Sequence, residues 1–474
     1  MLNLAHVITA LTHIEMQGIA RPILDVVVDS REVSPGAMFV ALPGEKADGH
    51  DYVQDAFDRG AAFALVQKDF SNQFPQIDLR LDEQLERIEA VDESPLCLRV
   101  EDSLSSLQTI AQYWRRQLNV RVIGITGSVG KSTTKEVVAE VLSRRYSTLK
   151  NPGNLNNEIG LPLTLLHLTE EHERAVLEMG FYVPGEIRLL CELASPSVGI
   201  VTNIGTVHAE RAGSIEEIVR GKTELVESLP PAPLGLAILN YDDLRVREMA
   251  SKTLANVFYY GLSPEADLWA DGVEGLGLDG IRFQMHYQNE VLHLRVPLIG
   301  RHSVHTALRA AAVGLNDGLT WQEIFDGLHE SQAQLRLVVA RAESGALILD
   351  DTYNASPEST LAALNLLDEM DGRKIAVLGD MLELGQYEQE GHELVGARAA
   401  EVVDKLVTVG NRGKLIAYAA ALSGLPDSAI LIFENNRQAI TYLSKHLETQ
   451  DVVLIKGSRG MKMEGIVAAL EAVQ

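Results

Sequence analysis

The sequence predicts an α/β protein made of three consecutive regions. Three observations lead to this prediction. Short apolar runs that are typical of buried strands alternate with helical patterns along most of the chain. A length of 474 residues is more than one ordinary domain needs. The pattern changes near residues 103 and 334, so we predict regions spanning 1–103, 104–334 and 335–474.

The first region is predicted to be a small α/β domain. Its strand-like segments are separated by turn residues, among them Pro35-Gly36 and Pro43-Gly44. The predicted strands span residues 24–28, 38–42 and 62–66.

The second region alternates strands and helices, which predicts a parallel sheet with helices on both faces. A helical pattern over residues 104–118 leads into the apolar run 120–125, which we expect to be a buried strand. A β-rich insert is predicted over roughly residues 257–296. Further short buried strands are expected at residues 175–178, 198–203 and 237–240.

The third region is predicted to be a doubly wound, Rossmann-like α/β domain, because five apolar runs alternate with helical patterns. The predicted strands span residues 347–349, 375–378, 405–409, 429–433 and 452–455.

Composition narrows the classes of function. Hydrophobic residues make up 46% of the chain and the mean hydropathy is +0.03, as expected for a soluble protein with sizeable cores. We find no leader-like start and no apolar run long enough to cross a membrane, which favours a cytoplasmic location without membrane insertion. Cys97 and Cys191 are far apart in sequence and argue against a disulfide framework. A net charge of −25 argues against a nucleic-acid partner, but not against an anionic substrate held by local cations.

The segment Gly124-Ile-Thr-Gly-Ser-Val-Gly-Lys-Ser-Thr133 carries the strongest functional signal. We expect the strand to be followed by a glycine-rich turn and then by a helix. The first backbone N–H groups of such a helix can bind phosphate. Lys131 adds a positive charge, and the Ser132 hydroxyl can bind Mg²⁺. The strict P-loop pattern fails by one residue, because Gly124 and Gly130 enclose five residues instead of four. The alternative is a turn without a ligand, but Lys-Ser-Thr-Thr in a first helical turn has little packing purpose. We therefore predict that Gly127, Ser128, Gly130, Lys131, Ser132 and Thr133 bind nucleotide.

Polar residues follow the predicted strands, at the sheet edge where parallel sheets bind ligands. Glu178 ends one strand and is a candidate Mg²⁺ ligand, with a solvated strand-end carboxylate as the alternative. His208 follows the next strand and can serve a cation or a phosphate, although a lone His is more often structural. Asn154, Asn156 and Asn157 lie in one loop and can contact a ligand or cap the backbone.

The ordered motifs resemble those of the Mur ligases, the ATP-dependent amide-bond-forming enzymes of peptidoglycan precursor synthesis. The resemblance covers nearly the whole chain and includes the extra residue of the P-loop. Within the family, the motifs are most similar to those of the ligase that adds D-alanyl-D-alanine. Besides the P-loop they are Asp29-Ser30-Arg31, Asn154-Leu-Asn-Asn-Glu-Ile-Gly160, Glu178-Met-Gly180, Pro184-Gly-Glu-Ile187, Asn203-Ile-Gly-Thr-Val-His208, Gly221-Lys222-Thr-Glu224, Gly300-Arg301-His302, Asp350-Asp-Thr-Tyr-Asn-Ala-Ser-Pro357, Gly379-Asp-Met-Leu-Glu-Leu-Gly385 and Lys456-Gly-Ser-Arg459.

The resemblance implies a domain that binds the UDP end of the substrate, then a P-loop ATPase domain, then a C-terminal ligase domain. The implied substrates are ATP, UDP-N-acetylmuramoyl-tripeptide and D-alanyl-D-alanine. The tripeptide carboxylate would attack the γ-phosphate, and the amine would attack the resulting acyl phosphate. A monomer is the default for this family. No motif fixes whether the third stem residue is diaminopimelate or lysine.

The resemblance also implies roles for single residues. Lys131 would contact the β- and γ-phosphates, and Ser132 and Glu178 would hold one Mg²⁺. His208 and Lys222 would serve a second Mg²⁺. Because an ammonium cannot ligate a cation, Lys222 would be carbamoylated to N-carboxylysine; a surface lysine paired with Glu224 or Glu227 is the alternative. Further contacts with ATP are implied for Arg336, His302, Asp351, Tyr353 and Asn354. For Tyr353, packing in the core is the alternative. Contacts with the other substrates are implied for Ser30, Arg31, Asn154, Asn156, Asn157, Lys456, Ser458 and Arg459.

The chain departs from the family pattern at three places. Ser303 and His305 stand where the family has two Asn residues. The first of these Asn residues meets adenine in the family, and Ser303 offers one hydroxyl instead of an amide. Phe181 and Tyr182 follow Glu178-Met-Gly180, where a small residue is usual. Gln334-Leu335 stands at the start of the third region, where the family has Pro-Gly.

Three other functions fit parts of the sequence. A folylpolyglutamate synthase shares the P-loop but lacks a UDP-type N-terminal domain. A Mur ligase that adds the third amino acid is expected to carry a different motif at residues 456–459. A nucleotide-dependent scaffold with this fold would have little need for two metal sites.

Overall fold

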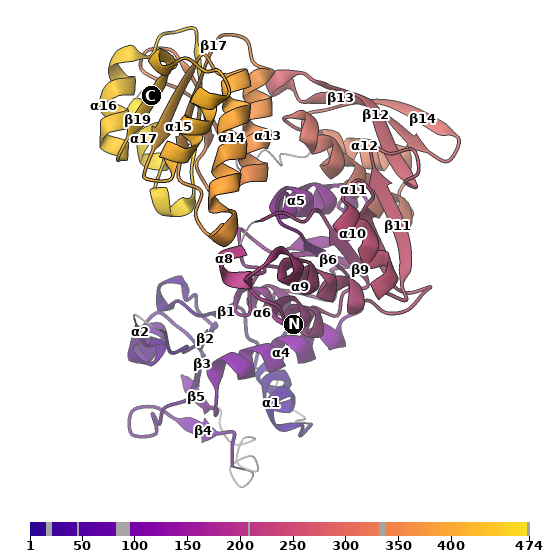
Figure 1. Ribbon diagram of the computed structural model, residues 1–474. Coiled ribbons are helices and arrows are strands. Elements are labelled where there is room, and N and C mark those ends of the chain that lie inside the picture. The colour runs from indigo at the N-terminus through magenta and orange to yellow at the C-terminus, as the bar shows by residue number, and fades with distance from the viewer. Residues whose placement is uncertain (16–20, 45–46, 82–94, 207–208, 331–337, 472–474) are drawn as a thin grey trace. The chain divides into compact units, whose positions relative to one another are not determined.

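The computed structural model describes residues 1–15, 21–44, 47–81, 95–206, 209–330 and 338–471 (Figure 1). The chain forms two compact units. The first consists of residues 1–124, 146–180 and 186–198, and the second of residues 125–145, 181–185 and 199–474. The region boundaries expected from sequence, after residues 103 and 334, stay predictions.

The N-terminal part holds a five-stranded parallel sheet with strand order β1-β2-β3-β5-β4. Its strands are β1 (Val26–Val27), β2 (Met38–Val40), β3 (Phe63–Val66), β4 (Gln76–Asp78) and β5 (Leu96–Arg99), with helices α1 (Leu4–Thr12) and α2 (Val53–Asp58). Phe39, Val53 and Phe57 are among the residues of its core. The small α/β domain is therefore confirmed, with β4 and β5 as strands that the apolar pattern did not reveal.

The central sheet has nine strands in the order β14-β13-β12-β11-β10-β9-β6-β8-β7. Strand β7 pairs in parallel with β8, β10 with β11, and β11 with β12, whereas β12, β13 and β14 form an antiparallel meander. The predicted β-rich insert is thus an extension of the central sheet. The strands are β6 (Arg121–Thr126), β7 (Thr148–Lys150), β8 (Arg174–Glu178), β9 (Val198–Val201), β10 (Leu236–Asn240), β11 (Asn256–Gly261), β12 (Leu268–Gly275), β13 (Ile281–Tyr287) and β14 (Glu290–Val296).

Helices follow the strands of the central region as the alternating pattern predicted. The capping residue of α4 is Asp102, whose side chain accepts a hydrogen bond from the backbone N–H of Ser105. The helices are α4 (Ser103–Gln117), α5 (Lys131–Leu142), α6 (Gly160–Leu166), α7 (Glu186–Ala194), α8 (Ala209–Ala212), α9 (Ile215–Glu227), α10 (Leu244–Glu248), α11 (Val304–Asn316) and α12 (Trp321–Glu330).

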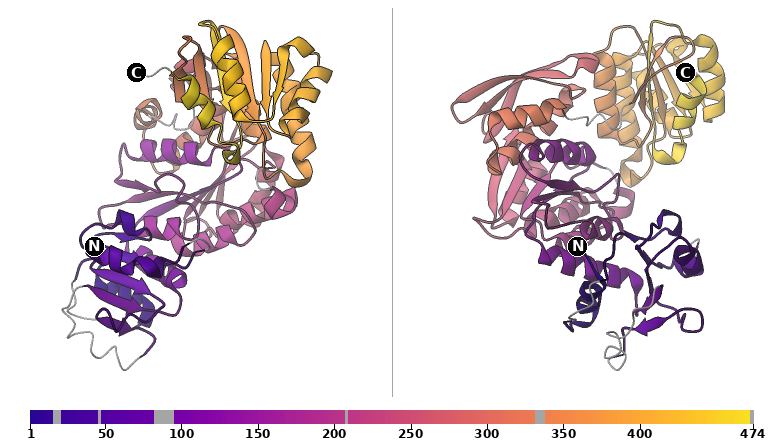
Figure 2. Two further views of the ribbon diagram at one scale, coloured as in Figure 1. Left: turned by 90° about the vertical axis from the view of Figure 1, so that its left-hand side faces the viewer. Right: turned by 180° about the vertical axis from the view of Figure 1, so that it is seen from behind.

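The C-terminal sheet has six strands in the order β15-β16-β20-β17-β18-β19, and only the β15–β16 pair is antiparallel among the described pairs. Its strands are β15 (Val338–Arg341), β16 (Leu347–Asp351), β17 (Arg373–Gly379), β18 (Lys405–Val409), β19 (Ile430–Phe433) and β20 (Asp451–Lys456). Apolar residues of α13 (Pro357–Asp368), α14 (Glu388–Val402) and α15 (Gly413–Leu422) form a core on one face. Those of α16 (Asn436–His446) and α17 (Glu464–Leu470) form a second core on the other face (Figure 2). The doubly wound prediction is confirmed.

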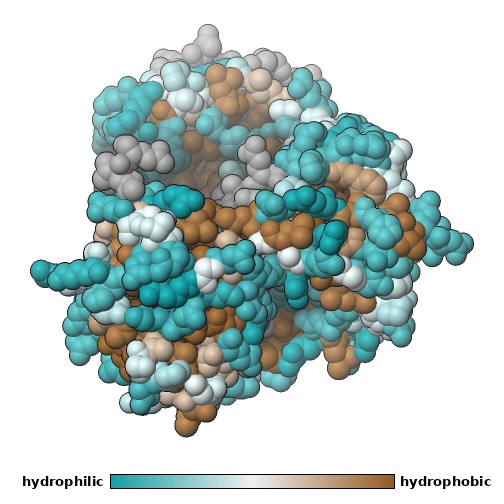
Figure 3. Space-filling view, turned by 90° about the horizontal axis from the view of Figure 1, so that it is seen from above, coloured by the Kyte–Doolittle hydropathy of each residue, from teal (hydrophilic) through white to brown (hydrophobic). Residues whose placement is uncertain are grey.

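The surface carries both hydrophilic and hydrophobic areas. Hydrophilic side chains cover much of the face drawn in Figure 3, with smaller hydrophobic areas between them. Among the described residues, no helix is both long and apolar enough to span a bilayer.

Helix α12 packs closely on α5 at Gly327, and this contact yields a stability prediction. A Cβ atom at Gly327 would lie 2.5 Å from the Cα atom of Val141, which is rigid backbone. We expect Gly327→Ala to lower the free energy of unfolding by about 1–3 kcal/mol, because overpacking outweighs the better helix propensity of alanine. Denaturant unfolding measures the change.

Gly465 supplies the matched control for that substitution. It also lies within a helix, but a Cβ atom there meets no described atom within 4 Å. We expect Gly465→Ala to leave the unfolding curve unchanged or to shift it slightly towards higher stability. Equal unfolding curves for the Gly327 variant and the wild type would contradict the prediction.

Candidate active site

The glycine-rich turn between β6 and α5 has a backbone that few residues other than glycine can adopt. Gly127 has φ +143° and Gly130 has φ +83°. A Cβ atom at Gly127 would lie 1.8 Å from the hydroxyl oxygen of Thr202. The turn is therefore a rigid element that excludes a side chain at this position.

The loop after β9 holds the turn in place. The Thr202 hydroxyl donates to the carbonyl of Val129 at 2.7 Å. The Asn203 side-chain oxygen accepts from the backbone N–H of Val129 at 2.9 Å, and its carbonyl accepts from the N–H of Ser128 at 2.9 Å. Asn203 belongs to one of the motifs found in the sequence but had no predicted role, and the structure shows that it supports the glycine-rich turn.

Two lysine amines converge on this turn. The Nζ atoms of Lys131 and Lys222 each donate to the carbonyl of Gly127 at 2.9 Å, and Lys131 also lies 3.3 Å from the carbonyl of Ser128. Lys222 is only 1% exposed, and its Nζ lies 4.7 Å from the centroid of the Phe181 ring. Burial, and next the positive charge of Lys131, lower the pKa of Lys222 well below its usual value.

The alternative of Lys222 as a surface lysine is therefore wrong. Its proposed acidic partner Glu224 is buried as well and accepts a hydrogen bond from the backbone N–H of Gly185 at 2.8 Å. Glu224 thus anchors the Pro184-Gly185 turn on helix α9. The unusual Phe181 is the residue that covers the amine of Lys222.

Glu178 ends strand β8 in the first compact unit and is buried, with 2% exposure. The alternative of a solvated carboxylate is thus wrong. The amide of Asn156 donates to its carboxylate at 2.9 Å. The side chain of Asn151 accepts from the backbone N–H of Glu178 at 2.9 Å and donates to its carbonyl at 3.2 Å. Sequence reasoning missed Asn151, although it stands directly after strand β7.

The three asparagines of the predicted loop have different surroundings. Asn156 orients the Glu178 carboxylate, whereas Asn157 accepts from the backbone N–H of Gly160 at 2.9 Å, at the beginning of α6. Asn154 is exposed. Backbone capping therefore occurs in this loop, and its contacts with a ligand stay predictions.

A cavity of about 420 Å³ lies within the second unit and collects most of the residues predicted to bind ATP. The P-loop residues Ser128–Thr133 form one part of its wall. Leu298, Ile299 and Leu366 give it apolar surfaces. Of the other predicted residues, the wall includes His302, Asp351, Tyr353, Asn354 and Lys456.

The wall residue His302 is uncharged near neutral pH. Desolvation, followed by the positive charges of Arg309 and Lys456, lowers the pKa of His302 to about 4. The Ser303 hydroxyl, which replaces an expected amide, donates to the carbonyl of Ile299 at 2.7 Å. The hydroxyl hydrogen of Ser303 is thus used in a hydrogen bond within its own turn.

Sequence reasoning missed two further wall residues, Arg309 and Glu358, and noted His305 only as a departure from the family pattern. A signal for Arg309 existed. His305 and Arg309 are four residues apart on the otherwise mostly apolar helix α11, so they share one face. Glu358 follows the Tyr353-Asn354 motif and accepts from the backbone N–H of Thr206 at 3.0 Å.

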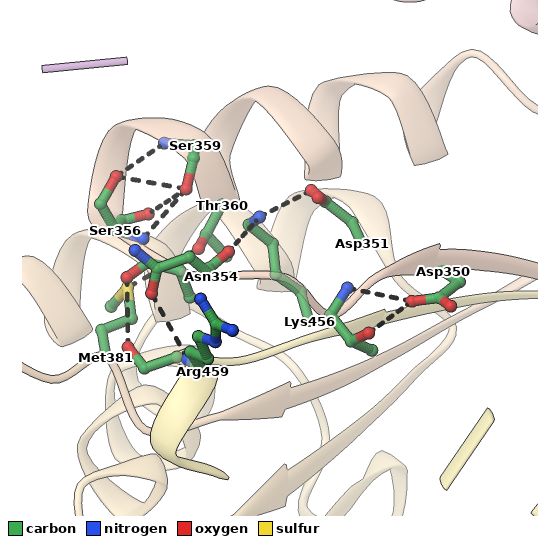
Figure 4. A network of polar contacts seen from close by, with 12 residues as sticks. Asp350, Asp351, Asn354, Ser356, Ser359, Thr360, Met381, Lys456 and Arg459 are labelled. Carbon is green, nitrogen blue, oxygen red and sulfur yellow. Dashed lines mark hydrogen bonds and ion pairs between the residues drawn. The ribbon is translucent and has the colours of Figure 1, made fainter. Parts of the chain in front are cut away.

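A polar network supports the cavity-lining loop of the C-terminal domain (Figure 4). Lys456, 2% exposed, lies 2.6 Å from the Asp351 carboxylate and donates to the carbonyl of Asn354 at 2.8 Å. The Ser458 hydroxyl donates to the carbonyl of Ala355 at 3.3 Å. Lys456 and Ser458 therefore position the loop, and their contacts with substrate stay predictions.

Tyr353 does not pack into the core. It is 40% exposed, it lines the cavity, and the Arg459 guanidinium lies over its ring at 5.5 Å. The core-packing alternative is therefore wrong.

In the N-terminal domain, Ser30 is buried and Arg31 is exposed at a short 3₁₀ turn. Asp29 accepts from the backbone N–H of Arg31 at 3.0 Å and from its guanidinium at 2.9 Å. These hydrogen bonds lower the pKa of Asp29 to about 2. Two predicted residues, His208 and Arg336, lie outside the described residues.

Comparisons with known proteins place these features in a family. Three family models match: the Mur ligase family catalytic domain over residues 23–94, the Mur ligase middle domain over 125–314, and the Mur ligase glutamate ligase domain over 335–459. A Bacillus subtilis protein is 34% identical over 94% of this chain and 92% of its own length. The chain belongs to the Mur ligase family.

Several relatives of this Mur ligase family member carry the same name. The B. subtilis protein and an Escherichia coli protein, 34% identical over 96% of each chain, are both UDP-N-acetylmuramoyl-tripeptide–D-alanyl-D-alanine ligases. A crystal structure of MurF from Acinetobacter baumannii is 31% identical, with a TM-score of 0.82 over 98% of this chain and 97% of that chain. MurF from Thermotoga maritima, solved in complex with ADP, is 27% identical, with a TM-score of 0.77 over 94% and 96%.

Proposed function

We propose that this Mur ligase joins D-alanyl-D-alanine to the terminal carboxylate of UDP-N-acetylmuramoyl-tripeptide at the expense of ATP. The observation that carries the proposal is the cavity in which the P-loop, His302 and the Asp351–Asn354 loop meet. It belongs to a chain that is 34% identical, over nearly its full length, to ligases with that name. The same proposal includes a cytoplasmic monomer with domains at 1–103, 104–334 and 335–474.

The reaction forms two bonds in sequence. The tripeptide carboxylate attacks the γ-phosphorus of ATP, which gives an acyl phosphate and releases ADP. The amine of D-alanyl-D-alanine then attacks the acyl carbon and loses a proton, and the bond from that carbon to the phosphate oxygen breaks. Phosphoryl transfer depends mainly on positioning and on neutralisation of charge.

Residues of the P-loop would both position the nucleotide and neutralise its negative charge. The N–H groups at the start of α5 would bind phosphate oxygens, and the Lys131 amine would leave the carbonyls of Gly127 and Ser128 for the β- and γ-phosphates. Asp351, Tyr353, Asn354 and, outside the described residues, Arg336 would contact ATP from the C-terminal domain. Contacts from two domains would exclude water, which otherwise hydrolyses an acyl phosphate.

Oxygen donors at the site fit Mg²⁺, which prefers hard oxygen ligands. The Ser132 hydroxyl and the Glu178 carboxylate, held by Asn156, would bind one ion. His208 and carbamoylated Lys222 would serve a second. No group of three or more His, Cys, Asp or Glu side chains forms a ready metal site within the described part of the chain. Bound Mg²⁺ would neutralise the charge of the phosphates.

The burial of Lys222 supports its carbamoylation. Carbamate formation joins the free amine to the carbon of CO₂ and releases a proton, so it requires an unprotonated lysine. A buried amine next to the positively charged Lys131 favours that state. The product would be an anion with two oxygen ligands, where the unmodified ammonium has none.

The remaining predicted residues would bind the other two substrates. Ser30 and Arg31 would contact the UDP end in the N-terminal domain. Asn154, Asn156 and Asn157 would lie near the tripeptide. Lys456, Ser458 and Arg459 would serve the peptide substrates from the C-terminal domain, with Arg459 the exposed member of this set.

Phosphate release tests the function directly. The protein is mixed with ATP and Mg²⁺, and the tripeptide substrate and D-alanyl-D-alanine are added separately and together. We expect phosphate release only with both, together with a UDP-linked pentapeptide found by mass spectrometry. Release with a different amine acceptor would indicate another ligase, and ATP binding without any release would indicate a scaffold.

Substitution of Lys222 tests the carbamate. We expect Lys222→Ala to lower the rate of phosphate release about a hundredfold or more, because a group that stabilises developing charge is lost. Added formate or acetate should restore part of the rate by supplying the missing anion.

Lys131→Ala is the control for that rescue. It removes a positive charge, so short carboxylates should not restore its activity. An active Lys222 variant without any added carboxylate would contradict the role assigned to Lys222.

A further inference from the structure

Arg309 is a buried arginine on the wall of the cavity. It lies on α11 and is only 4% exposed. One terminal nitrogen donates to the hydroxyl of Tyr260 at 3.2 Å and the other to the hydroxyl of Thr306 at 2.8 Å. The Nε atom is buried and has no hydrogen-bond acceptor among the described residues. Two of the five N–H donors of this guanidinium are therefore matched.

The charge of Arg309 lacks a counter-charge within the described residues. Both of its hydrogen-bond partners are neutral hydroxyls, and no ion pair with a carboxylate is found for it in the ranges that the structure describes. Asp242, the acidic group 3.8 Å from neighbouring His305, already accepts from the backbone N–H groups of Leu262 and Ser263. A buried cation without an anion is costly, which calls for an anionic ligand.

Arg115 shows what a purely structural buried arginine looks like in this protein. It is 9% exposed, and its three nitrogens donate to the carbonyls of Ala194, Leu118 and Val120 at 3.0, 3.1 and 2.7 Å. It is not among the residues that line the cavity. Arg309 differs in both respects, because its Nε atom has no acceptor among the described residues and because it faces a cavity.

The guanidinium lies at the phosphate-binding end of the cavity. A Cβ atom at Gly130 would be 3.4 Å from the Nη2 atom of Arg309. Gly130 caps the N-terminus of α5, directly before Lys131. The guanidinium thus lies beside the glycine-rich turn that begins α5.

We propose that Arg309 is a phosphate-binding residue of the nucleotide site, which donates to phosphate oxygens of ATP and ADP beside Lys131. The inference rests on the proposed function, which places a nucleotide in this cavity. Arg309 would then supply a second fixed cation opposite the N-terminus of α5. Its positive charge also contributes to the low pKa of His302, which places the two side chains in one electrostatic environment.

The test is binding of three ligands by calorimetry: ADP, tripolyphosphate and adenosine. We expect Arg309→Gln to weaken ADP and tripolyphosphate about tenfold or more, the usual effect of a lost charge-assisted hydrogen bond, and to leave adenosine within about twofold. Unchanged ADP affinity would overturn the proposal. An equal loss for adenosine and ADP would also overturn it, because it would indicate contact with the base or a general structural role.

Two further variants keep the test decisive. Arg309→Lys retains the charge and should weaken ADP binding less than the Gln variant does. If the Gln variant does not fold, the Lys variant decides. A threefold or larger loss of affinity for ADP but not for adenosine then supports the proposal, and no loss overturns it. Arg115→Gln should lower thermal stability without changing ADP affinity. A wild-type protein that binds no ADP would overturn the proposed function itself, together with this inference.

Discussion

The site depends on one backbone turn at Gly127. Its φ of +143° and the nearness of the Thr202 hydroxyl leave no room for a side chain. Because the chain turns here, the carbonyl of Gly127 can accept from both Lys131 and Lys222, and the first residues of α5 line the cavity. A glycine without a side chain thus fixes the positions of two lysine amines that the proposed chemistry uses differently, Lys131 as a cation and Lys222 as a carbamate.

The protein keeps a few basic side chains at the cavity or next to it within a strongly acidic chain. Their surroundings differ, and the differences suggest separate tasks. Lys456 is neutralised by Asp351 and supports a loop. Lys131 is held by backbone carbonyls that it can exchange for phosphate, and Lys222 is buried beside it under a phenyl ring. Arg309 hydrogen-bonds only to hydroxyls among the described residues, and its guanidinium lies 5.6 Å from the centroid of the Tyr260 ring. Because neither Tyr260 nor Thr306 is an anion, Arg309 is able to meet an anionic nucleotide.

Sequence patterns predicted the strand–helix alternation well, because apolar strands in parallel sheets are buried on both faces. They missed β4 and β5 of the N-terminal sheet, which are short. The motif residues Ser128–Thr133, His302 and Tyr353 were correctly expected to meet, since chemistry restricts their identity. Asn151 and Arg309 were missed because their roles depend on partners far along the chain. The burial of Lys222 and Glu178 also could not be foreseen, since sequence alone does not show which side of a helix or loop is covered.

Binding of ADP by a Gly127→Ala variant tests the central role of the turn most directly. We predict that this variant loses at least a hundredfold in ADP affinity, because its Cβ atom displaces Thr202 and the loop that holds the turn. Gly153→Ala is the control, since Gly153 also has a positive φ of +51° but its Cβ atom would meet no described atom within 4 Å. The control should bind ADP as the wild type does. Wild-type ADP affinity in the Gly127 variant would contradict the account.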